Sequence, residues 1–215
     1  MSFRIPNGST FDLASTYGSA ITITAISNAN PAVVTATAHG LADGDIIELT
    51  SGWTGVNGRL FRVDGSTTNS FELEGVDTTD TSLFAAGGGA GSCREITAFV
   101  GVTQVTDVSS NGGEQQFFTF GFLEEFDDRQ IPTTRSPYSL TIPVADDPAQ
   151  PFIPVAEAAD KRRNPVGVRL NIPGGAKILY NGYLTISETP TLTRNNLMIR
   201  TMTFSLAGRP TRYNA

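Results

Sequence analysis

Acidic side chains gather in one short stretch of this 215-residue chain, Glu124-Glu125-Phe126-Asp127-Asp128-Arg129. Paired carboxylates act as acid and base in most glycosidases, so one interpretation is a glycosidase that uses Asp127. Adjacent residues on a strand, however, point to opposite faces, and a loop fixes no separation between two carboxylates. The spacing is also not that of an EF-hand calcium loop. We therefore predict that the protein is not an enzyme and that this stretch holds no catalytic residue, metal or cofactor.

A second polar group consists of His39, Asp43, Asp45 and Glu48. A metal site needs several converging ligands, and this spacing is only a weak signal for one. A turn explains it better, because Gly40 and Gly44 permit positive φ and Asp side chains accept hydrogen bonds from nearby backbone amides. The chain has one Cys and one His, so it can form neither an intramolecular disulfide nor a structural zinc site from these residue types.

The only Trp, Trp53, lies in the loop sequence SGWTGVNG. An exposed indole can stack on a sugar ring, so one candidate function is that of a carbohydrate-binding virion or surface protein. A lone Trp that covers one end of a small barrel is the commoner arrangement.

Strands are the elements that would position these residues. Apolar residues make up 39% of the chain and charged residues 17%, with 22 Gly and 12 Pro, which is typical of a Thr- and Ser-rich all-β protein. Five short β-type runs in residues 21–74, each closed by a turn cluster, predict a small β-barrel. We place this inserted domain at residues 22–92, with a flexible Gly-rich return linker at 78–92. No stretch approaches the roughly 20 apolar residues of a membrane helix, and we expect no membrane insertion.

Residues 1–21 and 93–215 are then the main domain. Strict alternation over 178–186 and 198–206 predicts a long antiparallel hairpin with a wide connection. Residues 94–108 predict a strand pair or one long bent strand. In residues 115–123, Phe118, Phe120 and Phe122 share one face and Phe117 and Leu123 the other, so we expect burial of both faces, inside the domain or against a neighbouring subunit.

One short helix is predicted over residues 155–163. Asp147 is suited to cap its first free amides, Pro148 suits the first helical position, and Asn164-Pro165 stops it. The expected fold is therefore an antiparallel β-sandwich or barrel with one short α-helix, plus the inserted small β-barrel domain.

Charge is distributed unevenly along the chain. The formal net charge is -6, but residues 1–160 hold 6 Lys or Arg against 20 Asp or Glu, whereas residues 161–215 hold 9 against 1. The clustering can be chance on a solvated surface. It also fits an acidic surface of one copy that meets a basic surface of the next, as head-to-tail assembly requires.

The C-terminal third carries a family resemblance. Tyr180-Asn181-Gly182-Tyr183-Leu184, a Thr-rich connector with Arg194 and Asn, Arg200-Thr201-Met202-Thr203-Phe204 and Gly208-Arg209-Pro210 follow one another. This order resembles the C-terminal hairpin of the tail tube proteins of long, non-contractile-tailed bacteriophages (siphoviruses). The resemblance covers roughly residues 1–20 and 96–215.

The inserted residues carry a second resemblance. NPAVVTATAHGLADGDIIEL, NGRLFRV and NSFELEGVD are similar to a small β-barrel module of phage virion proteins, named for a domain of ubiquitin-activating enzymes. The name implies no such activity here, because that chemistry needs an adenylation domain and a catalytic Cys.

The first resemblance implies a structural virion protein, made in the host bacterial cytoplasm, that self-assembles into stacked hexameric rings. The rings would form the tail tube, the conduit for DNA ejection. The implied partners are other copies of the chain, a tape measure protein and tail tip or terminator proteins, with genomic DNA as passing cargo. The family's acidic loop reaches a neighbouring subunit. We expect the subunit contacts to use Glu124, Glu125, Asp127, Asp128, Arg129, Lys161, Arg162, Arg163, Arg194, Arg209, Phe118 and Phe120.

Overall fold

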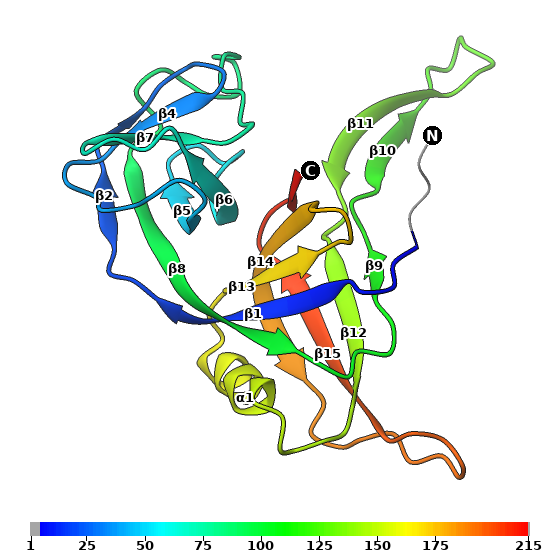
Figure 1. Ribbon diagram of the computed structural model, residues 1–215. Coiled ribbons are helices and arrows are strands. Elements are labelled where there is room, and N and C mark those ends of the chain that lie inside the picture. The colour runs from blue at the N-terminus through cyan, green and yellow to red at the C-terminus, as the bar shows by residue number, and fades with distance from the viewer. Residues whose placement is uncertain (1–4, 215) are drawn as a thin grey trace.

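The computed structural model describes residues 5–214 (Figure 1). Up to residue 102 the elements are β1 (Thr10–Tyr17), β2 (Ile21–Ile23), β3 (Ala25–Ile26), β4 (Ala32–Thr35), β5 (Ile46–Ser51), β6 (Arg59–Asp64), β7 (Ser70–Leu73) and β8 (Gly91–Val102). The remaining elements are β9 (Ser109–Asn111), β10 (Gln115–Phe120), β11 (Arg129–Arg135), β12 (Ser139–Ala145), α1 (Phe152–Arg162), β13 (Val166–Asn171), β14 (Lys177–Ile186), β15 (Ile199–Leu206) and β16 (Thr211–Tyr213).

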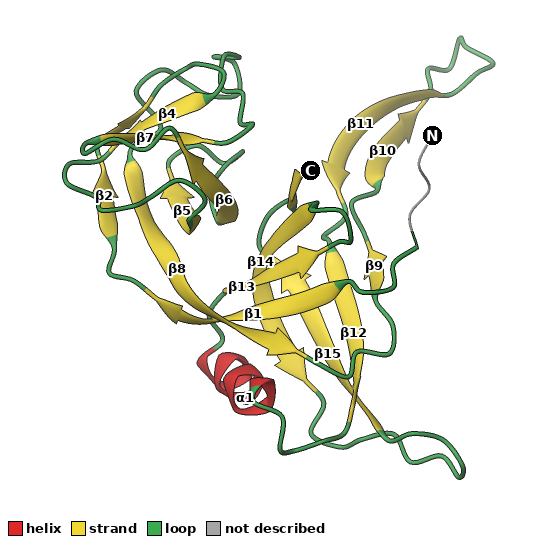
Figure 2. Ribbon diagram, in the orientation of Figure 1, coloured by secondary structure: helices red, strands yellow, loops and turns green. Residues whose placement is uncertain are grey.

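Antiparallel pairing joins most of these strands edge to edge. The order is β3-β4-β7-β6-β5-β8-β1-β13-β14-β15-β12-β9, with β16 paired to β14 and β2 to β8. Strands β10 and β11 form a separate two-stranded sheet. Figure 2 shows strands throughout the molecule and a helix on one side of the curved main sheet. The prediction of an all-β fold with one short helix is confirmed.

The buried apolar residues form two clusters. One lies between α1 and the strands β1, β8 and β12–β15, and includes Leu13, Phe152 and Phe204. The other is built from residues 23–93 and includes Phe61 and Phe71. Strand β8 links the two, because its first half pairs with β2 and β5 and its second half with β1. The predicted bent strand is thus one 12-residue strand.

Residues 22–92 pack against the main sheet along a seam. Ile46 and Leu60 are buried in the cluster of the main sheet rather than in that of their own segment. The Asn181 amide on β14 donates to Glu48 Oε1 at 3.0 Å and to the Gly58 carbonyl at 3.1 Å. The two cores share strand β8 and a packed seam. The boundaries of the inserted domain at residues 22 and 92 remain a proposal.

The Gly-rich return segment is closely packed, in contrast to the expected flexible linker. The Trp53 indole N–H donates to the Ala85 carbonyl at 2.8 Å, and the Ser51 hydroxyl donates to the Gly89 carbonyl at 3.0 Å. A Cβ at Gly89 would lie 2.9 Å from the Ile26 Cβ and 3.1 Å from the indole. The glycines thus let the backbone approach Trp53, which composition alone does not reveal.

The C-terminal hairpin pairs as predicted, with Leu184 opposite Phe204 and Ile186 opposite Met202. The helix begins earlier than expected, at Phe152 after Pro151, so the predicted helix cap at Asp147 is wrong. Asp147 instead accepts from the Ala149 amide at 3.2 Å and from the Gln104 side chain at 3.0 Å, and so closes the preceding turn. Its short side chain competes for local amides before the helix starts.

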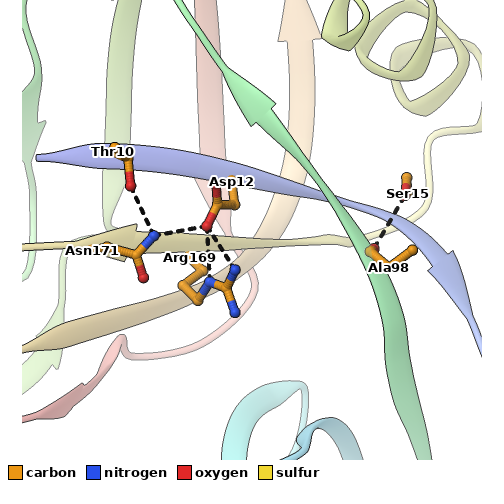
Figure 3. A network of polar contacts seen from close by, with 6 residues as sticks. All are labelled: Thr10, Asp12, Ser15, Ala98, Arg169 and Asn171. Atoms are coloured by element: carbon orange, nitrogen blue, oxygen red, sulfur yellow. Dashed lines mark hydrogen bonds and ion pairs between the residues drawn. The ribbon is translucent and has the colours of Figure 1, made fainter. Parts of the chain in front are cut away.

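A polar network fixes the register of β1 on β13 (Figure 3). Asp12 Oδ2 accepts from Arg169 Nε at 2.9 Å, from Arg169 Nη2 at 2.8 Å and from the Asn171 amide at 2.7 Å. The same amide donates to the Thr10 hydroxyl at 3.0 Å. Arg169 therefore neutralises the Asp12 side chain within one chain and is not free to pair with a neighbouring copy.

Candidate assembly surface

A two-stranded arm, β10–β11, projects from the main sheet, and its tip lies far from α1 (Figure 1). Phe117 pairs with Pro132, Phe118 with Ile131 and Phe120 with Arg129. Residues 121–128, here called the hairpin tip, connect the strands. The predicted acidic loop is thus carried at the end of a regular hairpin.

Large apolar side chains on this arm face solvent. Leu123 and Phe126 at the tip are fully exposed at 106% each, and Phe118 is 61% exposed. Along one face, the rings of Phe118 and Phe120 are stacked with centroids 6.1 Å apart, and those of Phe120 and Phe122 meet edge to face at 5.7 Å. Burial of this strand inside its own domain is therefore wrong. Contiguous exposed apolar surface of this kind marks a protein contact.

The carboxylates of the tip are largely unpaired. Glu125 forms an ion pair with Arg129, whose guanidinium also lies 5.7 Å from the centre of the Phe122 ring. Glu124, Asp127 and Asp128 have no ion pair with any residue in the range 5–214. They lie in solvent on a connection, which is not the enclosed, fixed pair that glycoside hydrolysis needs.

The polar group around His39 forms a turn, as its glycine and aspartate pattern indicates. The Leu41 amide donates to His39 Nδ1 at 3.1 Å, and the Ala42 amide donates to Asp45 Oδ2 at 2.8 Å. Asp43 accepts from the Ser66 amide at 2.7 Å. The described residues contain no group of three or more His, Cys, Asp or Glu side chains that could hold a metal ion.

Trp53 is buried, with 3% of its surface exposed, and Phe84 lies edge to face against it at 5.2 Å. An indole enclosed in this way cannot stack on a sugar. The sequence feature that supported carbohydrate binding is therefore part of a hydrophobic core.

The basic residues predicted to meet the acidic loop lie on three separate elements. Lys161, Arg162 and Arg163 are exposed at the end of α1, Arg194 lies in the long connection between β14 and β15, and Arg209 precedes β16. No ion pair joins any of them to the hairpin tip within the described part of one chain. Such contacts can form only between copies.

Two features of the surface were not predicted. Between β14 and β15, Leu192, Leu197 and Met198 are exposed, at 75%, 59% and 46%. A cavity of about 290 Å³ lies between α1 and β1, and Arg94 and Arg162 are among the residues that line it. The three apolar residues beside turn residues were a signal for the first. The cavity depends on how the helix packs, and no sequence pattern marks it.

Three buried groups have raised pKa values. Burial raises the pKa of Tyr17 to about 12, although the Gly167 amide donates to its hydroxyl at 2.8 Å. Burial likewise raises the pKa of Tyr213 to about 12 and that of the Cys93 thiol to about 11. All three are neutral near pH 7, so Cys93 is a core residue with little thiolate.

No helix within residues 5–214 is both long and apolar enough to cross a membrane. The fold is that of a β-rich protein, and its exposed apolar groups include several on the β10–β11 arm and on the connection between β14 and β15. A model of the phage tail tube protein family (TTP) matches residues 51–215. The chain therefore belongs to the phage tail tube protein family, and it is a structural component of the virion.

Two solved structures are similar to this chain at low identity. A chain in the cryo-EM structure of the anti-feeding prophage baseplate has 12% identity and a TM-score of 0.38, over 55% of this chain and 86% of that one. A chain in the anti-feeding prophage tube-terminating cap has 15% identity and a TM-score of 0.35, over 50% and 79%. Neither likeness is close enough to carry a structural argument. No curated protein matches the sequence.

Proposed function

We propose that this chain self-assembles into stacked hexameric rings that form the tail tube of a long-tailed phage and serve as the conduit for DNA ejection. The observation that carries the proposal is the exposed β10–β11 arm. Leu123 and Phe126 stand fully in solvent on a chain of the tail tube family. Ring number and the non-contractile tail follow from the sequence resemblance of the C-terminal hairpin.

One face of the main sheet supports the conduit. Neighbouring positions on β12, β15 and β14 are Ser139, Ser205 and Tyr183 in one row and Thr141, Thr203 and Thr185 in the next. None of these side chains is charged. Lys or Arg on a channel wall would bind phosphates with salt-dependent affinity, so a hydroxyl-bearing face suits a wall along which DNA slides. Tape measure, tail tip and terminator proteins are the further partners of such a tube.

Negative-stain microscopy of the purified protein over a concentration series tests assembly. We expect rings or tubes from the natural chain, and monomers from a Leu123→Ser/Phe126→Ser variant with an unchanged urea midpoint. Leu83→Ser is a matched control, because Leu83 is 69% exposed on the inserted segment and away from the arm. A natural chain that stays monomeric at every concentration, or a tip variant that assembles normally, would contradict the proposal.

A further inference from the structure

The residues that line the cavity beside α1 suit an apolar side chain next to acidic groups. Its walls include Ala14 and Val166 on the sheet side and Val155 and Ala158 on the helix side, with Arg162 at one edge. Its volume, about 290 Å³, lies at or below the roughly 300–1,000 Å³ of ligand pockets, so it fits one or two side chains better than a cofactor. We call this cavity the α1 socket.

The charge of the socket is partly uncompensated. Arg94 forms an ion pair with Glu48 at 2.5 Å and lies over the Tyr17 ring at 4.9 Å. Arg162 is exposed and has no ion pair with any residue in the range 5–214, and its neighbours Lys161 and Arg163 are also exposed cations. The same end of α1 carries the negative pole of the helix dipole, but a pole of about half an elementary charge does not cancel three cations.

The hairpin tip has the complementary features. It presents two fully exposed apolar side chains, Leu123 and Phe126, beside three carboxylates that form no ion pair with the described residues. The other exposed apolar connection, residues 187–198, carries one anion and one cation, Glu188 and Arg194, and so has no net charge. A second cavity, near Phe11 and Val108, contains Asp107 and no Lys or Arg among the residues that line it. Like-charge repulsion disfavours the acidic tip in the second cavity, and a connection without net charge gains no electrostatic attraction from the socket.

We propose that the α1 socket of one copy receives the hairpin tip of a second copy, with Phe126 or Leu123 in the cavity and Asp127 and Asp128 beside Arg162. This inference rests on the proposed function and names the surfaces that it uses. The tip and α1 lie at opposite ends of the folded molecule (Figure 1). A contact between two different surfaces leaves both free on the outer copies, so it repeats from copy to copy, as a tube requires.

Site-directed crosslinking tests the contact directly. Cys93 is 1% exposed, so a maleimide reagent has little native target in the folded chain. A Glu124→Cys variant mixed with an Ala158→Cys variant should give a covalent dimer with a short bifunctional maleimide. Glu124→Cys mixed with Thr185→Cys, on the hydroxyl-bearing sheet face, is the control and should give none. A double variant, with both cysteines in one chain, should give a ladder of higher oligomers.

Charge and size variants test the same contact without a reagent. Asp127→Lys/Asp128→Lys and Arg162→Asp should each raise the concentration needed for assembly several-fold, and their combination should recover part of the loss. Ala158→Trp fills the socket and should raise the concentration needed for assembly about tenfold. Arg194→Asp makes the same charge change outside the socket and should have a smaller effect. An unchanged urea midpoint shows that each monomer remains folded.

The outcomes separate the two proposals. Rings or tubes that form without the tip-to-Ala158 crosslink would overturn the socket and leave self-assembly standing. Absence of any assembly by the natural chain would overturn both. A crosslink at Ala158 together with charge rescue would support the socket, whereas equal crosslinking at Thr185 would show nonspecific encounter and count against it.

Discussion

Asn181 should hold the seam between the inserted residues and the main sheet. Its side chain is 3% exposed, and its amide donates to Glu48 Oε1 at 3.0 Å and to the Gly58 carbonyl at 3.1 Å. Both neighbours are acceptors, which fixes the amide orientation and leaves Asn181 Oδ1 without a hydrogen bond in the described residues. Asn181→Ala therefore removes the donor from two enclosed acceptors at once.

The expected loss follows from those two acceptors. A buried acceptor left without its donor costs about 1–3 kcal/mol. Glu48 keeps its ion pair with Arg94, so the loss from Glu48 lies at the low end of this range. We expect Asn181→Ala to lower the free energy of unfolding by about 2–4 kcal/mol in total. Arg94→Met leaves the Asn181 amide on Glu48. Because the Arg94 side chain is 45% exposed, solvent screening limits that loss to about 1 kcal/mol or less.

Urea unfolding followed by Trp53 fluorescence measures both variants, since Trp53 lies in the core of the inserted residues. The Asn181→Ala midpoint should fall by about 1 M or more, given a slope of about 1–3 kcal/mol per M. Thr185→Ala, an exposed change on the same strand, should shift it little. A larger loss for Arg94→Met than for Asn181→Ala would refute the reasoning, because the ion pair and not the buried amide would then hold Glu48.

Three further predictions concern pH, the glycine segment and DNA. Tyr17 and Tyr213 have folded-state pKa values of about 12, above the ordinary value of 10, so the unfolded chain loses these protons at lower pH than the folded chain. The free energy of unfolding should therefore be unchanged below about pH 10 and fall as the pH rises toward 12, by up to roughly 2 kcal/mol per tyrosine. Urea titrations over this pH range measure the change. Gly89→Ala should lower the free energy of unfolding by about 1–3 kcal/mol and change Trp53 fluorescence, because its Cβ would lie 2.9 Å from Ile26. Gly87→Asn, at a positive φ with open space around it, should leave the stability nearly unchanged, and equal losses for the two variants would contradict this. The protein at micromolar concentration should not shift duplex DNA in a gel near physiological salt, and a clear shift would count against a sliding wall.

Sequence pattern predicted the fold class because strand alternation is a local signal. The pairs Leu184–Phe204 and Ile186–Met202 bury the residues whose period of two identified them. The helix start was misplaced because Asp147 is equally suited to close a turn, and only the Gln104 contact across the fold decides between the two. The packing of Gly89 on Trp53 was missed for the same reason, since a glycine run looks identical whether it is free or in close contact.

The β10–β11 arm shows where sequence reasoning about burial stops. Alternation and aromatic content predict an apolar contact for Phe117–Phe122, but they carry no information on whether the partner is the same chain or another. In the single chain Phe117, Phe118 and Phe122 remain exposed, and β10 and β11 form a separate two-stranded sheet. The described residues include 37 buried apolar ones, yet Leu123 and Phe126 remain fully exposed, so the contact that we propose for them is one between copies.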